Sequence, residues 1–275
     1  MKIGLEIIND INKCRVKYGQ VAFWWLGQLG YAIKIGKVIL YIDIYLENNE
    51  RRSIPPLLRP EEVINADVIL GTHDHSDHID RTSWNQISKS SPNAKFITPS
   101  LVLNSLPKDL DMNEDRFIGL NDGVSASLNG ITITGIASAH ELLNKDEKTG
   151  EYPCLGYVIE GNGVKIYHAG DTCIYPELYQ KLKSNGQFDV IFLPINGRDG
   201  IRLENNIIGN MTYQEAVDLA GYLEPALVVP GHYEMFSHNS ENPELFTNYL
   251  KVKYPSIKTW VGEHGERVIS SLDQL

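Results

Sequence analysis

The 275-residue sequence is short of cysteine, of basic residues and of long apolar runs, and each shortage excludes a class of protein. Its three cysteines, Cys14, Cys154 and Cys173, are too few and too scattered for a disulfide framework, which favours a reducing compartment. Lysine and arginine together number 25 against 35 aspartates and glutamates, so the net charge is −10 with histidine neutral. Because a nucleic-acid-binding protein normally carries a basic surplus, no nucleic-acid partner is expected.

Segments that target or anchor a protein are also missing. No apolar stretch approaches the roughly 18–20 residues that a membrane span requires. The polar N-terminal segment lacks the continuous apolar core of a signal peptide. We therefore expect a cytoplasmic protein with no membrane partner. The composition, 42% hydrophobic and 22% charged, is typical of a soluble globular fold.

Apolar runs punctuated by glycine predict many short strands with helices between the later ones. The predicted strands cover residues 21–26, 31–35, 38–42, 66–72, 95–98, 131–136, 155–160, 164–168, 190–193, 226–229, 258–261 and 267–269. The predicted helices are an N-terminal one carrying Leu5, Ile8 and Ile11, and those over residues 60–64, 100–106, 176–183, 212–222 and 243–250. Thr212 and Glu215 form the capping box of the helix over 212–222.

The order of these elements predicts the architecture. No linker-like or low-complexity stretch interrupts the sequence, so one domain over residues 1–275 is expected. Strands grouped in hairpins and then separated by helices are typical of mixed sheets rather than of a repeated βαβ barrel. Two halves of similar rhythm meet between about Leu120 and Gly130, which indicates two packed sheets flanked by helices, an α/β fold.

One segment is dense in groups that bind metal. The run from His73 to His78 reads His-Asp-His-Ser-Asp-His and follows an apolar strand. Because His73 and His75 are two residues apart, an extended loop points both imidazoles the same way. Asp77 and His78 follow as the loop bends toward the next helix, and can face a second point. Imidazole with carboxylate is the ligand set of zinc, iron or manganese.

Three more candidate ligands occupy equivalent places farther along the chain. His140, Asp171 and His232 each follow a predicted strand closely. Folds with mixed or parallel sheets usually place their sites just beyond strand ends. The sequence therefore predicts a metal site built from His73, His75, Asp77, His78, His140, Asp171 and His232.

This ordered set of motifs, from roughly Val21 to Phe246, resembles the metallo-β-lactamase-fold hydrolases. The resemblance implies an αββα sandwich with up to two divalent metals at the sheet edge. It implies that His73, His75 and His140 bind one metal, that Asp77, His78 and His232 bind a second, and that Asp171 bridges them. It also implies that Asp43 orients the ligand residues. Asp74 and Asp80 are weaker candidates for that orienting role.

Softer motifs narrow the resemblance. The segments 25–31, 72–80, 196–200 and 232–236 together resemble the L-ascorbate-6-phosphate lactonases, cytoplasmic enzymes associated with manganese. This resemblance implies a small anionic substrate and favours Mn²⁺, whereas Zn²⁺ is the usual metal of the wider superfamily. Asn196, Arg198 and Tyr233 are the candidate substrate-binding donors, and Arg198, Arg202 and Lys165 are the candidate cations for a phosphate.

The chemistry expected of such a site is hydrolysis. Metal-bound hydroxide would attack the carbonyl of a lactone of a sugar-acid phosphate, with Asp77 and Asp171 as the catalytic carboxylates. A phosphodiesterase of the same fold is the alternative, and a non-catalytic metal-binding protein is a third reading that the complete ligand set disfavours. The sequence leaves the substrate, the metal and a homo-oligomeric state open.

Overall fold

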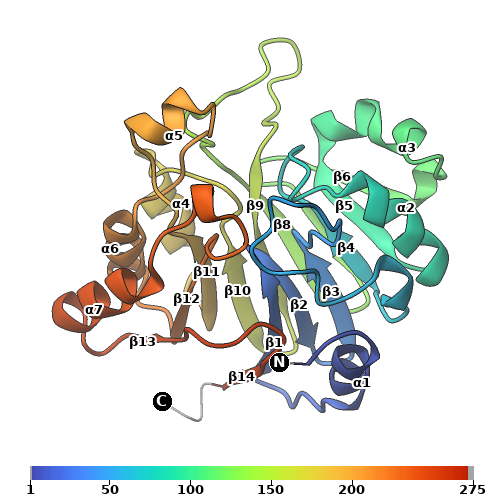
Figure 1. Ribbon diagram of the computed structural model, residues 1–275, viewed down its shortest axis with the longest axis horizontal. Helices are drawn as coiled ribbons and strands as arrows, with labels where there is room; N and C mark the ends of the chain where they lie inside the picture. Colours follow the sequence, from blue (N-terminus) through green and yellow to red (C-terminus); the bar gives the residue numbers. More distant parts are fainter. Residues whose placement is uncertain (1, 272–275) are drawn as a thin grey trace.

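The computed structural model describes residues 2–271 and consists of two seven-stranded sheets packed face to face, with helices on both outer sides (Figure 1). Strands β1 to β7 are Gln20–Gly27, Gly30–Ile35, Val38–Ile42, Val68–Leu70, Lys95–Pro99, Phe117–Leu120 and Ser125–Leu128. Strands β8 to β14 are Ile131–Ala137, Leu155–Gly161, Val164–His168, Val190–Pro194, Leu227–Gly231, Lys258–Thr259 and Arg267–Ser271.

Helices α1 to α7 are Leu5–Lys13, Arg81–Ser90, Leu106–Asp109, Leu178–Ser184, Gly200–Glu204, Tyr213–Leu223 and Pro243–Lys253. Four short 3₁₀ helices, η1 to η4, are Pro60–Glu62, Ser100–Asn104, Glu114–Arg116 and Ser237–Asn239. None of the helices within residues 2–271 combines the length and the apolar character that crossing a membrane requires.

The strand order explains the two halves. The first sheet runs β14-β1-β2-β3-β4-β5-β6 and the second runs β13-β12-β11-β10-β9-β8-β7, so the chain changes sheets between β6 and β7. Only the last strand returns, because β14 pairs antiparallel with β1. Hairpins β1–β2–β3 and β8–β9–β10 are antiparallel, whereas β3 to β6 and β10 to β13 pair in parallel. The predicted class of two mixed sheets flanked by helices is confirmed.

Both faces of the first sheet are buried, and strand β1 shows why its sequence is apolar almost throughout. Alternate side chains of a strand point to opposite faces. Accordingly Phe23 and Trp25 face the second sheet, whereas Trp24 packs with Ile8 and Ile11 of α1 on the outer side. A strand covered on both faces reads as a continuous apolar run rather than as an alternating one.

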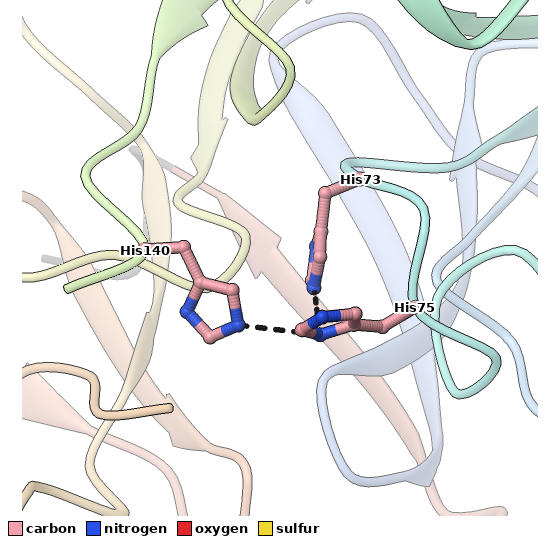
Figure 2. A group of neighbouring side chains, drawn as sticks. All are labelled: His73, His75 and His140. Atoms are coloured by element: carbon pink, nitrogen blue, oxygen red, sulfur yellow. Dashed lines mark hydrogen bonds between the residues drawn. The ribbon is translucent and has the colours of Figure 1, made fainter. Parts of the chain in front are cut away.

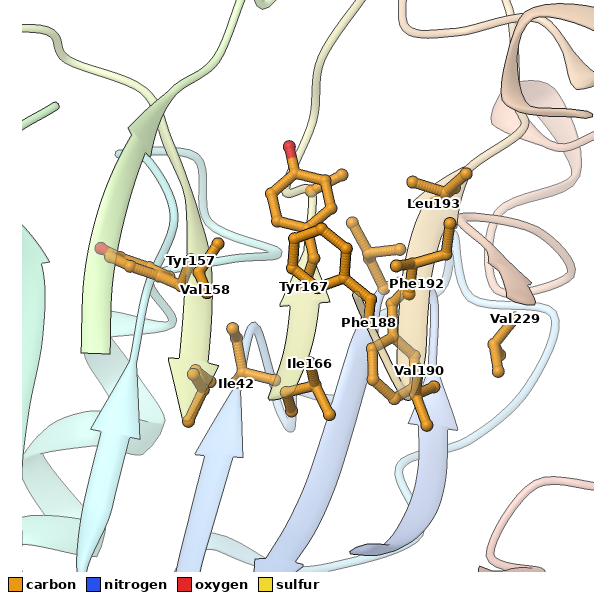
Figure 3. Close-up of a cluster of buried hydrophobic side chains, with 14 of the residues drawn as sticks. Ile42, Tyr157, Val158, Ile166, Tyr167, Phe188, Val190, Phe192, Leu193 and Val229 are labelled. Atoms are coloured by element: carbon orange, nitrogen blue, oxygen red, sulfur yellow. The ribbon is translucent and has the colours of Figure 1, made fainter. Parts of the chain in front are cut away.

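Between the sheets lies an aromatic-rich core (Figure 3). Tyr157 and Phe192 of the second sheet face the first: the Tyr157 hydroxyl donates to the Gly71 carbonyl (2.9 Å), and the Phe192 ring packs on Tyr31, with ring centroids 4.4 Å apart. Tyr167 points to the outer face of the second sheet, where it packs on Phe188. Helices α4, α6 and α7 cover the outer face of the second sheet, and α1, α2 and α3 cover that of the first. Burial of this extent holds the strand ends, and hence the loops that follow them, in fixed relative positions.

Most predicted elements are present, and the differences concern mainly short helices and edge strands. The predicted helix over 100–106 is the 3₁₀ helix η2 followed by the single-turn α3, because Pro107 cannot donate a backbone hydrogen bond within a continuous helix. The sequence prediction places a helix after His78 without giving the bounds of α2, and it lacks helix α5 and the edge strands β6 and β7. The predicted helix over 60–64 is the 3₁₀ helix η1. The capping box of Thr212 and Glu215 opens α6 as predicted.

Candidate metal centre

The seven predicted ligands meet at one edge of the sandwich, where strands from both sheets end. His73 to His78 follow β4, His140 follows β8, Asp171 follows β10 and His232 follows β12. Three overlapping groups have ligand atoms within 4.8 Å of one another: His73 with His75 and His140; His73 with His78 and Asp171; Asp77 with His78 and His232.

The loop after β4 turns sharply so that one segment supplies both groups. The backbone carbonyl of His75 accepts hydrogen bonds from the amides of His78 (3.0 Å) and Ile79 (2.8 Å). This turn reverses the chain after His75, so His78 comes back beneath His73, with ring centroids 4.1 Å apart. The motif is therefore a compact turn rather than a solvated loop.

Three imidazoles of the first group point their nitrogens at one another (Figure 2). His75 Nδ1 lies 2.9 Å from His73 Nε2 and 3.3 Å from His140 Nε2. Asn210 Oδ1 lies 3.1 Å from His140 Nδ1 and can only accept, so that nitrogen carries the proton and His140 Nε2 carries a lone pair. A single proton on His75 Nδ1 could form a good hydrogen bond to only one of the two neighbouring nitrogens. One cation could instead be bound by one nitrogen of each of the three rings.

Asp171 lies between the two groups. Its Oδ1 is 3.5 Å from His78 Nε2, and its Oδ2 is 3.2 Å from His232 Nε2 and 3.9 Å from His140 Nε2. The carboxylate thus spans the histidines of both predicted metal positions. Asp77 approaches the second group from the cavity side, with Oδ2 3.7 Å from His78 Nε2.

The electrostatics of the cluster suit a cation. Burial lowers the pKa of His73 well below its usual range and that of His140 to about 4, so both rings are neutral at pH 7. Burial opposes a charge on His78, but the carboxylates of Asp171 and Asp43 raise its pKa well above its usual range. Burial also opposes a charge on Asp171, yet His232 and His78 hold its pKa well below its usual range. A bound cation would take the place of the proton that these carboxylates attract.

Two buried polar atoms without partners among the described residues indicate that the cluster fits a divalent metal. His78 Nε2 and Asp171 Oδ1 are buried and have no hydrogen-bond partner within the described part of the chain. Orphaned buried polar atoms are costly unless a ligand satisfies them. Both atoms point into the centre of the cluster, where a metal would coordinate them. No cysteine of residues 2–271 joins the ligand groups, so the donor set is imidazole and carboxylate.

Asp43 supports two of the ligands from behind. Its carboxylate accepts from the Thr72 amide (2.9 Å), from the Thr72 hydroxyl (2.7 Å) and from His78 Nδ1 (2.7 Å). The Thr72 hydroxyl also lies 3.1 Å from His73 Nδ1. These contacts place the proton of His78 on Nδ1 and leave Nε2 for the metal. Asp43 adopts a positive φ of 48°, and His232 one of 64°, so the backbone is held in an uncommon conformation at the site.

Asp74 and Asp80 make other contacts. Asp74 forms an ion pair with Arg81 (2.5 Å) and is exposed. Asp80 caps helix α2 through the Ser83 amide and accepts from the amides of Leu46 and Glu47 (both 2.9 Å). Asp80 therefore joins the motif to the loop after β3, whereas Asp74 pairs at the surface.

A chain of side-chain amides leads from the metal centre to the cavity. His140 Nδ1 donates to Asn210 Oδ1, Asn210 Nδ2 donates to Asn196 Oδ1 (3.1 Å), and Asn196 Nδ2 donates to Asn239 Oδ1 (2.8 Å). Asn196 and Asn210 are fully buried. Asn210 and Asn196 each accept with the amide oxygen and donate with the amide nitrogen, so every hydrogen bond of the chain runs from His140 toward Asn239. Asn239 is left with its Nδ2 as a donor beside the cavity.

Two of the three predicted substrate-binding donors, Asn196 and Arg198, have structural partners, and the hydroxyl of the third, Tyr233, is buried without a hydrogen-bond partner among the described residues. Asn196 uses both ends of its amide within the chain just described. Arg198 pairs with both carboxylate oxygens of Glu215 (2.7 Å each) and donates to the Asn210 carbonyl (3.0 Å), which fixes the loop that carries Asn210. Tyr233 is fully buried against Trp25, with ring centroids 4.7 Å apart.

A cavity of about 280 Å³ opens beside the cluster. Its wall combines ligand candidates, amides, two cationic or titratable side chains and a few apolar groups: Tyr45, Asn49, Arg51, His75, Ser76, Asp77, His140, Asp171, Asn206, Ile207, Ile208, His232, Phe236, His238 and Asn239. The volume suits a small polar molecule lying directly against Asp77 and Asp171.

Several residues of the metal centre and its surroundings are missing from the sequence prediction. Gln28 lies within segment 25–31, and its Nε2 is 3.4 Å from Asp77 Oδ2 and 3.5 Å from His232 Nδ1. Thr72 opens the metal-binding motif and could have been found by its position. Asn210, Asn239 and Arg51 stand alone in loops, and no local pattern marks them.

Comparison with known proteins identifies relatives over most of the chain. Residues 41–233 match the beta-lactamase superfamily domain. The chain is 31% identical to a UPF0173 metal-dependent hydrolase of Thermococcus kodakarensis over 242 residues, which are 88% of this chain and 97% of that protein. It is 28% identical to a UPF0173 metal-dependent hydrolase of Archaeoglobus fulgidus over 245 residues, 88% of this chain and 96% of that protein.

Solved structures share the fold. The metallo hydrolase Igni18 of Ignicoccus hospitalis superposes with a TM-score of 0.69 at 24% identity, covering 91% of this chain and 98% of that one. An isothiocyanate hydrolase from Delia radicum gut bacteria superposes with a TM-score of 0.70 at 18% identity, covering 90% and 98%. At such identities the likeness concerns the fold alone.

Proposed function

The chain belongs to the UPF0173 metal-dependent hydrolases of the beta-lactamase superfamily, and we propose that it opens the lactone ring of a sugar-acid phosphate, with L-ascorbate 6-phosphate as the favoured substrate. The observation that carries the proposal is the position of Asp77 and Asp171. Both belong to the metal-binding cluster, and both line a small cavity whose remaining polar wall is rich in amides. A compact hydroxylated substrate fits such a wall better than a polymer does.

The residues that would hold metal are the two groups joined by Asp171. His73, His75 and His140 would hold one cation, and Asp77, His78 and His232 a second. A divalent cation supplies a lowered pKa for water and polarises a carbonyl or phosphoryl oxygen. Five imidazoles and two carboxylates without a thiolate accept zinc, iron or manganese. We propose that manganese supports activity at least as well as zinc.

The protein's own groups account for the rest of the reaction. Asp77 faces the cavity with a partly exposed carboxylate and would accept the proton of the attacking water. Attack on the lactone carbonyl places negative charge on the carbonyl oxygen, which a fixed donor stabilises. When that charge returns to the carbonyl, the bond to the ring oxygen breaks, and the proton held by Asp77 would pass to the leaving oxygen. Asn239 Nδ2 is such a donor, because Asn196 already occupies its Oδ1. This role replaces the one that the sequence predicted for Asn196 itself.

The test is reconstitution of metal-stripped protein with Mn²⁺ or Zn²⁺, followed by assays on L-ascorbate 6-phosphate and on bis(p-nitrophenyl) phosphate. We expect lactone opening with Mn²⁺ at a rate equal to or above that with Zn²⁺. Activity with Zn²⁺ alone would overturn the metal proposal. Turnover of the phosphodiester alone would overturn the lactone proposal and favour the phosphodiesterase alternative.

Two variants separate chemistry from folding in this assay. Asp171→Asn removes the charge between the two groups and should abolish turnover of every substrate. Asp74→Asn is the matched control, because Asp74 belongs to the same motif but pairs with Arg81 at the surface. Equal loss in both variants would contradict the assignment of Asp171.

A further inference from the structure

The cavity beside the metal centre is lined by an arginine, Arg51, that the sequence analysis did not identify as a candidate. Of the described residues lining it, Arg51 is the one arginine, and no lysine joins it. The chain as a whole carries −10, so this is a local exception to a negative surface. We propose that the Arg51 guanidinium binds an anionic group, a phosphate or carboxylate, on the substrate; the proposal rests on the function proposed above.

The three basic residues that the sequence predicts for this role all form ion pairs with carboxylates. Arg198 is held by Glu215, and Arg202 pairs with Asp199 and donates to the Ser240 carbonyl (2.7 Å). Lys165 pairs with Glu160 (3.1 Å) and donates to a backbone carbonyl. A cation already neutralised by a carboxylate gains little from a second anion, so none of these three is free to bind substrate.

Two neighbouring arginines in the loop after β3 are used differently. Arg52 is half-buried, donates to the carbonyls of Tyr45 (2.9 Å) and Ile54 (2.8 Å), and lies 5.2 Å from the centre of the Tyr45 ring. It therefore holds the loop together from inside. Arg51 is exposed, and its guanidinium has neither an ion pair nor a hydrogen bond within residues 2–271.

The loop also presents Arg51 in a fixed position. The Arg51 amide donates to Asn49 Oδ1 (3.0 Å), and Asn49 Nδ2 in turn donates to the Tyr45 hydroxyl (2.5 Å). The Ser53 amide donates to the Met235 carbonyl (2.7 Å), which ties this loop to the segment carrying His232. A backbone anchored on both sides of Arg51 lowers the entropy lost when its side chain binds a ligand.

The surroundings of Arg51 complete an anion site. Asn206 and His238 line both the metal-centre cavity and an adjoining hollow of about 780 Å³, as does Arg51 itself. Glu50 lines only the outer hollow, so the carboxylate nearest in sequence stands on the side away from the metal centre. A planar guanidinium with an amide and an imidazole nearby matches the oxygens of a phosphate or carboxylate.

The experiment compares matched substrates in metal-loaded protein: L-ascorbate 6-phosphate and L-ascorbate, the same lactone with and without the phosphate. Arg51→Ala should raise KM for the phosphorylated lactone ~10- to 100-fold, the effect expected of one charge-assisted pair, and change kcat little. The unphosphorylated lactone should be affected much less. Arg51→Lys should fall between, because it keeps the charge but loses the two-pronged geometry.

Arg15→Ala is the matched control, since Arg15 is an exposed arginine just after α1 that lines neither the metal-centre cavity nor the adjoining hollow, and its loss changes the net charge equally. It should leave the preference for the phosphorylated lactone unchanged. Equal kinetics of wild type and Arg51→Ala on both lactones would overturn the inference while leaving the lactonase proposal intact.

A binding measurement keeps the two proposals separate. Titration calorimetry of the same metal-loaded proteins with 6-phosphogluconate and with gluconate requires no turnover. Wild type should bind the phosphorylated acid at least about tenfold more tightly, and Arg51→Ala should lose that difference. If neither lactone is opened but this difference is present, the lactonase proposal fails and the anion site stands. If Arg51→Ala retains the difference, the anion site is refuted.

Discussion

The chain of amides behind His140 yields the most specific prediction. Asn210 is fully buried and joins His140 Nδ1 to Asn196 Oδ1 through two hydrogen bonds of 3.1 Å each. Asn210→Ala removes both and leaves a buried N–H and a buried carbonyl oxygen without partners. Each such loss costs ~1–3 kcal/mol, so the unfolding free energy should fall by about 2–6 kcal/mol. Freeing the ring of a metal-binding histidine typically weakens metal affinity about 10- to 100-fold.

Asn210→Asp tests the direction of the chain. A carboxylate at this position can still accept from His140 Nδ1 but cannot donate to Asn196. Metal affinity at the group of His73, His75 and His140 should therefore be kept, although the fold loses stability through the Asn196 contact. Asn205→Ala is the control, because this neighbouring amide is exposed and donates only to the Ile201 carbonyl of its own helix; its effect should stay within about 0.5 kcal/mol.

The assay has two readouts for each variant. Calorimetric titration of chelator-treated protein with Zn²⁺ and Mn²⁺ gives the affinity, and urea denaturation gives the unfolding free energy. The reasoning predicts weaker metal binding in Asn210→Ala than in Asn210→Asp. If the two variants bind metal equally well, the proton on His140 Nδ1 is not held by Asn210 and the inferred direction is wrong.

Three further predictions concern other parts of the molecule. Asp171→Ala should lower the metal bound per chain and abolish turnover but leave the circular dichroism spectrum unchanged, because the carboxylate contributes charge rather than core packing; full metal content would contradict this. Burial lowers the pKa of His264 to about 4, so the unfolded chain takes up its proton near pH 6.5 before the folded protein does. The unfolding free energy should therefore fall as pH drops from about 6.5 to 4, and His264→Phe, which keeps the stacking on Trp25, should flatten that slope in urea titrations. Burial raises the pKa of Cys154 to about 12, so iodoacetamide should label it slowly at pH 7.5 in the native protein and rapidly in urea; rapid native labelling would refute the low thiolate content.

The parts of the fold that the sequence predicted best are those that local chemistry determines. Strand β3, Val38–Ile42, and the capping box at Thr212 follow directly from apolar runs and N-cap preferences. The edge strand β7 was missed because its sequence, Ser125–Leu128, alternates polar and small residues without a strong apolar pattern. Strand β14 was predicted as a strand, but its return to β1 depends on long-range pairing that no local signal encodes.

The candidate metal ligands were easier to predict from the sequence than the side chains that hydrogen-bond to them. Few side chains bind divalent metals, so histidines and aspartates placed after apolar strands stand out in a sequence. A hydrogen-bonded support can be almost any polar group, and its partner can lie anywhere along the chain. His140 and Asn210 are 70 residues apart, and Asn196 and Asn239 are 43 apart.

The role of Arg51 also depends on residues distant in sequence, in this case on the absence of a nearby carboxylate partner among residues 2–271. The sequence offers Arg198 as one of three candidate cations for a phosphate, but in the fold Glu215 of α6 pairs with its guanidinium at 2.7 Å. Whether a cation is free to bind a ligand depends on which carboxylates the fold brings to it. The candidate metal-binding cluster could therefore be predicted from residue types placed after apolar strands, whereas the arginine that we propose to bind the anionic group of the substrate could be singled out only once the charged partners were placed.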